Sequence, residues 1–190
     1  VPIPLICSPI PLEYIPEFPD KMYFASFVGS LTHQIRADMY YACQDKEDYK
    51  ILMCNWSNTV PLENVKTFID VALKSKFSLC PRGYGPTSFR LYESFQLNTV
   101  PVYISDRHYL PWEDELIWSD FCVIIKESEI NDLDNIYSIT TVLEEELKLK
   151  TFWARSKYSI SMDQLENFSS DIKVFIKNTI NGFQPFILSS

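Results

Sequence analysis

Short apolar runs alternate with segments of helical periodicity over residues 22–130. The apolar runs predict five strands, at Tyr23–Val28, Ile51–Cys54, Phe77–Cys80, Val100–Ile104 and Phe121–Ile125. Between them, apolar residues recur at helical spacing over 34–44, 62–74 and 88–97, which predicts helices. Because alternating strands and helices are typical of the α/β class, we expect a Rossmann-like parallel sheet flanked by helices.

The two ends of the chain differ from this middle part. Residues 1–20 carry six prolines, which predicts an extended lead-in or linker. Residues 131–190 are more polar, with helical charge pairs such as Glu144 and Lys148, and a last helix is predicted from Met162 to Ile180. We therefore divide the chain into a lead-in over 1–20, a Rossmann-like domain over 21–130, and a C-terminal helical segment over 131–190 that packs on it.

Composition narrows the classes of protein that fit. The formal net charge is −8, which argues against a general binder of nucleic acid or of an anionic membrane. No apolar run is long enough to span a bilayer. The five cysteines form no C-x-x-C pair, so they favour buried thiols in a reducing compartment. We expect a cytoplasmic protein, with the Golgi lumen as the alternative if the full-length protein carries an N-terminal anchor.

The segment from Phe77 to Glu93 is typical of a phosphate-binding turn. A predicted strand leads into a short loop with Gly83 and Gly85, and a helix follows. A helix N-terminus presents unpaired N–H groups and a partial positive charge, and glycines let the backbone approach a ligand closely. Arg82 and Arg90 flank the turn. The pattern therefore predicts a site for a phosphate or diphosphate at the carboxyl end of this strand.

Two features of this turn have alternative interpretations. Thr87 or Ser88 is either a plain hydroxyl cap of the helix or part of the ligand site, and no capping box closes because position 90 is Arg and position 91 is Leu. Arg90 and Glu93 share a helix face and form either a surface ion pair or a functional pair. In the functional interpretation Arg90 contacts phosphates, and Glu93 accepts hydrogen bonds from ribose hydroxyls.

The stretch from Lys76 to Asp106, with its Cys80-Pro-Arg-Gly-Tyr-Gly-Pro86 core, resembles the signature of exostosin-like glycosyltransferases, glycosyltransferase family 47. Leu110-Pro-Trp112 and Ile117–Ile125 continue the likeness, and Phe27-Val-Gly-Ser30 with Arg36 resembles the first strand, loop and helix of the same nucleotide-binding half. The resemblance covers about residues 22–130. It implies the C-terminal, donor-binding half of a GT-B fold, in which two Rossmann-like domains face each other across a cleft.

The resemblance also implies functions for particular residues. The donor would be a nucleoside-diphosphate sugar, UDP- or GDP-linked, and the acceptor a glycan or glycoprotein, with no nucleic acid as partner. Arg90 would neutralise the departing diphosphate, and Glu93 would hold the ribose. Asp106 and Arg107 would lie near the sugar or the base. The remaining donor-binding residues would be Gly29, Ser30, Arg36, Arg82, Gly83, Tyr84, Gly85 and Ser88.

By the same likeness, transfer would invert the anomeric carbon, and a carboxylate or histidine would deprotonate the acceptor. Arg90, Asp106 and His33 are the catalytic candidates in this chain, with His33 either a base, a phosphate contact or a loop residue. The family's base often comes from an N-terminal acceptor half, which we expect to be absent or very reduced in these residues. A non-catalytic partner or scaffold domain of the same fold is therefore the alternative function.

We expect no metal and no separate cofactor. Asp132-Leu-Asp134 matches a metal-binding D-x-D pattern, but a helix N-cap role is favoured. Glu113-Asp-Glu115 is interpreted as a solvated loop, and His108 as a loop residue. Four aromatic residues lie near the predicted strand ends: Tyr103, Tyr109, Trp112 and Trp118. The first interpretation is that they pack in the core or at a domain interface, and the second is that they stack on a sugar.

Overall fold

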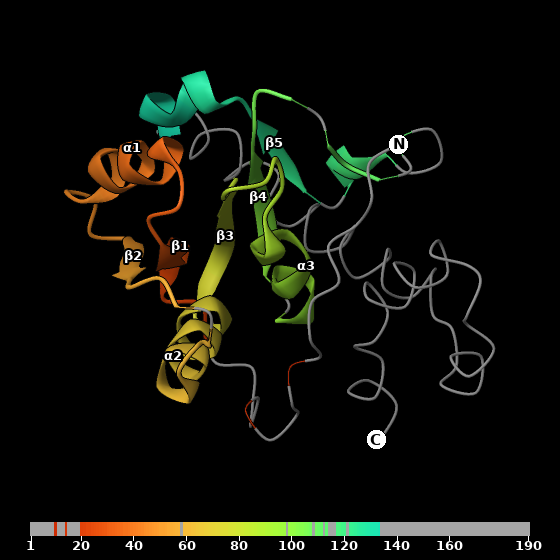
Figure 1. Ribbon diagram of the computed structural model, residues 1–190. Coiled ribbons are helices and arrows are strands. Elements are labelled where there is room, and N and C mark those ends of the chain that lie inside the picture. The colour runs from red at the N-terminus through yellow and green to blue at the C-terminus, as the bar shows by residue number, and fades with distance from the viewer. Residues whose placement is uncertain are drawn as a thin grey trace, which may run out of the picture.

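A computed structural model describes residues 10, 14, 20–57, 59–97, 99–107, 109–111, 113, 117–120 and 122–133. Within them, five strands form one sheet in the order β2-β1-β3-β4-β5, and every neighbouring pair is parallel (Figure 1). The strands are β1 (Tyr23–Ser30), β2 (Tyr49–Cys54), β3 (Ser75–Pro81), β4 (Val100–Ile104) and β5 (Val123–Ile125). The α/β, Rossmann-like class predicted from the sequence is confirmed.

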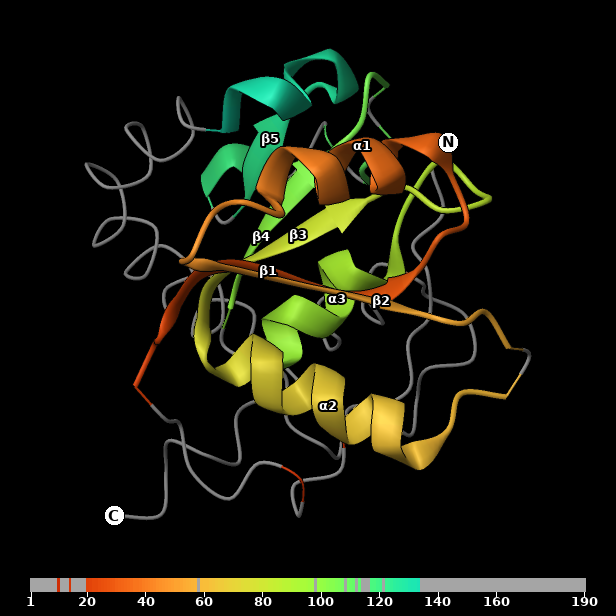
Figure 2. The same cartoon turned by 90° about the vertical axis from the view of Figure 1, so that its left-hand side faces the viewer.

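Helices cover both faces of the sheet. Helix α1 (Gln34–Cys43) lies on one face, and α2 (Leu62–Leu73) and α3 (Phe89–Gln96) lie on the other (Figure 2). A 3-10 helix, Glu127–Asp132, packs beside α1, and a shorter one spans Trp118–Asp120. In the described part of the chain, no helix combines the length and the apolar character that a membrane crossing requires.

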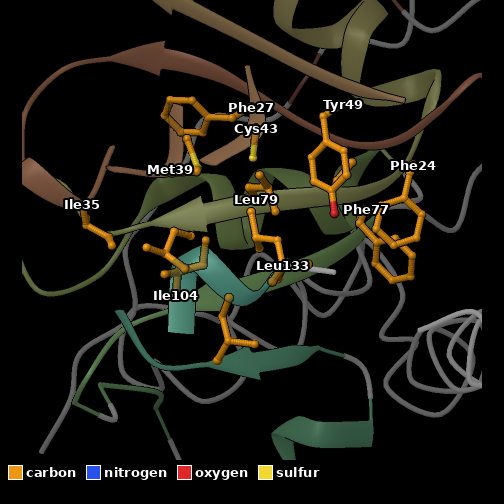
Figure 3. Packing of buried hydrophobic residues seen from close by; sticks show 14 of the residues in the cluster. Phe24, Phe27, Ile35, Met39, Cys43, Tyr49, Phe77, Leu79, Ile104 and Leu133 are labelled. Atoms are coloured by element: carbon orange, nitrogen blue, oxygen red, sulfur yellow. The ribbon is translucent and has the colours of Figure 1, made fainter. Parts of the chain in front are cut away.

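Strand periodicity explains how the two faces fill. Successive residues of a strand point to opposite faces, so Phe27 enters the α1 side and Val28 the α2 side. The α1-side cluster contains Phe24, Phe27, Met39, Phe77 and Leu79, which Figure 3 shows packed together. Cys80 and Cys122 lie in another buried cluster, which also contains residues of α3. Burial there raises the pKa of the Cys80 thiol to about 12. As predicted, the described cysteines are free thiols, most of them buried.

The strand order places a switch point at β1. The chain passes from β1 to β2 on one side and then crosses to β3 on the other side of β1. Ligands of open α/β sheets bind beyond the carboxyl ends of the strands at such a point. The residues at the ends of β1 and β3, Gly29-Ser30 and Pro81-Arg82, are therefore brought together by topology alone.

The predicted boundaries are exact for β4 and within one residue for the three helices, whereas each of the other four strands differs by two residues at one end; β2 and β3 begin two residues earlier than predicted. Strand β1 is longer than predicted, because Gly29 and Ser30 continue the ladder opposite Met53 and Cys54 of β2. Strand β5 begins at Val123 rather than at position 121, since Cys122 is a buried bend before it.

The chain ends are described only in part. Ile10 and Tyr14 pack against the cluster of α2, and the Ile10 N–H donates to Gln96 Oε1 at 2.7 Å, so these two residues of the lead-in contact the domain. The helices predicted beyond residue 133, including Met162 to Ile180, and the Glu144–Lys148 pair lie outside the described residues. The three-part division of the chain stays a prediction.

Candidate functional site

Arg36 joins the loops that follow β1 and β3. From the first turn of α1, its Nη1 donates to Ser30 O at 2.7 Å, and its Nε donates to Arg82 O at 3.0 Å. Its Nη2 donates to Pro81 O at 3.4 Å. The planar fork of a guanidinium suits such a set of carbonyls, which a lysine could not bridge. Arg36 therefore fixes the floor of the predicted donor site, mainly through contacts with the backbone.

Burial and the neighbouring charge of Arg90 both disfavour the charged form of Arg36. Its guanidinium lies 5.2 Å from the centre of the Phe27 ring, and burial, followed by the charge of Arg90, lowers the pKa of Arg36 to about 10. The group still carries its proton at neutral pH. Because two guanidinium groups repel each other here, an anion between them would stabilise both charged forms.

Arg90 and Glu93 form the ion pair that the sequence left as one of two alternatives. Nη1 of Arg90 donates to Glu93 Oε2, while its Nε donates to Val28 O at 2.9 Å. The guanidinium also lies over the Phe68 ring of α2, 3.9 Å from its centre. Both side chains of the pair are only 22% exposed. The pair is therefore a half-buried feature at the carboxyl edge of β1, not a solvated surface contact, and Glu93 fixes the guanidinium that the ligand would meet.

The loop after β3 requires glycine at one position for close packing. A Cβ on Gly83 would lie 3.1 Å from Arg36 Nη2 and 3.2 Å from Thr32 Oγ1, which is tighter than ordinary contact. A Cβ on Gly85 would meet nothing within 4 Å. Gly83 thus lets the loop approach the end of β1, whereas the open space at Gly85 leaves room for a ligand beside the backbone.

The N-terminus of α3 has a hydroxyl cap. Ser88 Oγ accepts a hydrogen bond from the Arg90 N–H at 3.3 Å, so the cap interpretation is confirmed for Ser88. No capping box closes, as expected from Leu91 at the third helical position. The N–H groups of Arg90 and Leu91 are taken by Ser88 Oγ and Ser88 O, so those of Ser88 and Phe89 are the ones that this helix N-terminus could offer to a ligand beside the glycine loop.

Three buried polar atoms around this loop have no hydrogen-bond partner among the described residues. They are Thr32 Oγ1, Arg82 Nε and Thr87 Oγ1. Buried polar groups are normally paired, and an unpaired one costs roughly 1–3 kcal/mol. Thr32 was not predicted from the sequence, because a threonine two residues after a strand has no distinctive pattern. Groups left unpaired in this way point to hydrogen bonds with a ligand or with water, beyond those that the described residues supply.

The two proposed catalytic side chains outside the loop make structural contacts. His33 is the N-cap of α1, and its Nδ1 accepts from the Ile35 N–H at 3.3 Å. That bond places the proton of the neutral ring on Nε2, which suits a donor to an anion better than a base. Asp106 is exposed, and its Oδ1 accepts from the Glu127 N–H at 2.8 Å. Both roles in catalysis stay predictions.

Two of the aromatic residues near β4, Tyr103 and Trp118, have the core role that was the first interpretation. Trp118 is buried and donates from Nε1 to Pro111 O at 2.9 Å, and the buried Tyr103 donates from its hydroxyl to Arg107 O at 3.1 Å. Tyr109 is half-buried beside them, and its N–H donates to the Tyr103 hydroxyl. Trp112 and His108 lie outside the described residues. The core role is thus confirmed for Tyr103 and Trp118.

No group of acidic, histidine or cysteine side chains suited to a metal ion occurs among the residues that the structure describes. Asp132 is the last residue of the 3-10 helix Glu127–Asp132, and Asp134 lies outside the described residues. The D-x-D pattern therefore receives no support as a metal site from the described part of the chain.

Comparison with known proteins defines the class of protein. The family model of the exostosin GT47 domain matches residues 1–140, and the chain belongs to that glycosyltransferase family. Among similar proteins are a "probable glucuronosyltransferase" of Oryza sativa subsp. japonica, 31% identical, and a "probable beta-1,4-xylosyltransferase" of Arabidopsis thaliana, 34% identical. Each match covers 77 residues, or 40% of this chain. The chain spans only 18% and 19% of the length of these two relatives.

Proposed function

We propose that this chain binds the nucleoside-diphosphate sugar donor of a glycosyltransferase at the carboxyl ends of β1 and β3. The observation that carries the proposal is the set of unpaired buried groups, Thr32 Oγ1, Arg82 Nε and Thr87 Oγ1, around a loop of excess positive charge. The charges of Arg36, Arg82 and Arg90 are only partly offset here by the carboxylate of Glu93, within a chain whose net charge is −8. A local concentration of cations in an acidic protein supports a specific anion, and the family supports a sugar nucleotide.

The diphosphate of the donor has several partners in this proposal. The diphosphate meets Arg82, Arg90 and the N-terminal amides of α3, while the loop of Gly83 and Gly85 lets it approach the backbone. As the sugar is transferred, charge develops on the departing diphosphate, and fixed cations stabilise it. Nε2 of His33 is available as a further donor to that charge.

The finer features of transfer belong to the same proposal. The reaction inverts the anomeric carbon and needs no metal, because arginines and helix amides neutralise the leaving group. The donor is UDP- or GDP-linked, the acceptor is a glycan or glycoprotein, and an N-terminal acceptor domain supplies the base. The cytoplasm is the expected compartment, with the Golgi lumen for an anchored full-length form.

A transfer assay tests the proposed reaction. The full-length protein is incubated with UDP- and GDP-sugars and a panel of glycan acceptors, with and without EDTA. We expect acceptor-dependent release of nucleoside diphosphate that EDTA does not suppress. Donor binding without release for any acceptor would favour the alternative function, a non-catalytic partner of the same fold, and would contradict the enzymatic proposal.

The ribose contact yields a separate prediction for Glu93→Ala. We expect the wild-type chain to bind UDP or GDP roughly ten- to a hundredfold more tightly than the 2′,3′-dideoxy analogue, as for a charged hydrogen bond of roughly 1.5–3 kcal/mol. The variant should lose this preference while it stays folded. Calorimetry with both nucleotides checks this.

Asp70→Ala is the matched control, because it also removes the carboxylate of a helical ion pair, with Lys74, away from the site. It should leave the preference intact. If Glu93→Ala kept the full preference for the ribose hydroxyls, Glu93 would be only a partner of Arg90.

A further inference from the structure

Two large aromatic side chains meet in solvent beside the glycine loop. Trp56 follows β2 and is 57% exposed, and Tyr84 follows β3 between Gly83 and Gly85 and is 74% exposed. Their ring centres are 6.3 Å apart, and the rings are nearly perpendicular, at 85°. Because β1 lies between β2 and β3 in the sheet, this contact spans the carboxyl end of β1.

The positions of Trp56 and Tyr84 relative to the proposed donor contacts indicate which part of the ligand they would meet. Trp56 is on the loop that leads from β2 into α2, and α2 carries Phe68, on which Arg90 stacks. Arg90 in turn holds Glu93. The proposed ribose contact therefore lies on the α2 side of the site, and Trp56 is in the loop that leads into that helix. Tyr84 stands within the loop proposed for the diphosphate.

We infer that Trp56 and Tyr84 form the stacking surface for the base of the donor nucleotide, an inference that rests on the proposed function. The arginines account for the diphosphate and Glu93 for the ribose, so the base is the remaining planar, partly apolar part of the ligand. Bases stack favourably on aromatic side chains, and the interaction tolerates different bases because each has a π face. The pair thus contributes affinity for a nucleoside beyond that for the diphosphate alone.

The experiment compares GDP with inorganic pyrophosphate in calorimetric titrations of the full chain. We expect Trp56→Ala to bind GDP about tenfold more weakly, equivalent to about 1.4 kcal/mol, and pyrophosphate as the wild type does. Trp56→Tyr, which keeps an aromatic face, should recover most of the GDP affinity. GDP should also quench tryptophan emission in the wild type and far less in Trp56→Phe.

Tyr41→Ala is the matched control. Tyr41 is 66% exposed and forms a similar near-perpendicular pair with Tyr40, but it lies in the last turn of α1, away from the carboxyl edge. This variant should bind both ligands as the wild type does.

Several outcomes would overturn the inference, and they are distinguishable. Unchanged GDP affinity in Trp56→Ala, or an equal loss for GDP and pyrophosphate, would overturn it while the proposed function stands. Weakened binding of an acceptor oligosaccharide with unchanged GDP affinity would assign the pair to a glycan instead. Failure of the wild-type chain to bind GDP, UDP or pyrophosphate would contradict the proposed function itself.

Discussion

Arg90→Lys is expected to weaken the binding of UDP or GDP by roughly a hundredfold while the chain stays folded. Lysine keeps the positive charge but loses the planar fork, the hydrogen bond to Val28 O and the stacking on Phe68. A hundredfold loss corresponds to about 2.8 kcal/mol, which matches the loss of one or two charge-assisted hydrogen bonds to the diphosphate at roughly 1.5–3 kcal/mol each. Calorimetry measures the affinity, and a thermal melt confirms the fold.

Lys74→Arg is the matched control for this variant. It exchanges the same two residue types at the end of α2, where Lys74 pairs with Asp70. It should change neither nucleotide affinity nor stability by a measurable amount. If Arg90→Lys bound nucleotide as tightly as the wild type, the guanidinium of Arg90 would be a structural group and would not contact the diphosphate.

The second large expected effect is on the free energy of unfolding, which should fall in Arg36→Ala but not in Arg82→Ala. Arg36→Ala should lower the free energy of unfolding by about 3 kcal/mol, because the carbonyls of Ser30, Pro81 and Arg82 lose their donor. Arg82→Ala should leave stability nearly unchanged, since its buried Nε has no partner among the described residues. The same variant should still weaken nucleotide binding. Urea denaturation measures the first difference and calorimetry the second.

The two arginines serve as controls for each other. Arg36 is expected to act on stability through backbone contacts, and Arg82 on affinity through a ligand contact. If Arg82→Ala were as destabilising as Arg36→Ala and bound nucleotide normally, the unpaired Nε would not mark a ligand site. A stable Arg36→Ala variant would show that the loops hold their positions without its guanidinium.

The sequence was sufficient to predict the fold. Strand β4, Val100–Ile104, was predicted to the residue, and helix α3 within one residue at each end. Such elements are short apolar runs or helical repeats between clear breaks, so local pattern determines them. Pairing is not local: Gly29 and Ser30 joined β1 because β2 continues beside them. The start of β5 was missed because Cys122 is apolar like its neighbours yet bends away from the ladder.

The candidate site stays a prediction, and the sequence indicated its residues better than their contacts. The glycine loop, Arg90 and Glu93 were found because they are close in sequence, on one loop and one helix turn. Arg36 was expected to meet the donor, yet its fork binds backbone carbonyls 45 and 46 positions away. Trp56 was not singled out, because its contact with Tyr84 depends on the neighbouring loops of β2 and β3. Such contacts between distant segments are set by tertiary structure.

The most direct test of the central claim is a calorimetric titration of the wild-type chain with UDP and with GDP. We expect saturable binding of at least one of them below about 1 mM, within the range of ordinary enzyme substrates. We also expect that inorganic pyrophosphate competes with that nucleotide for the same site. No binding of either nucleotide up to about 1 mM would contradict the account.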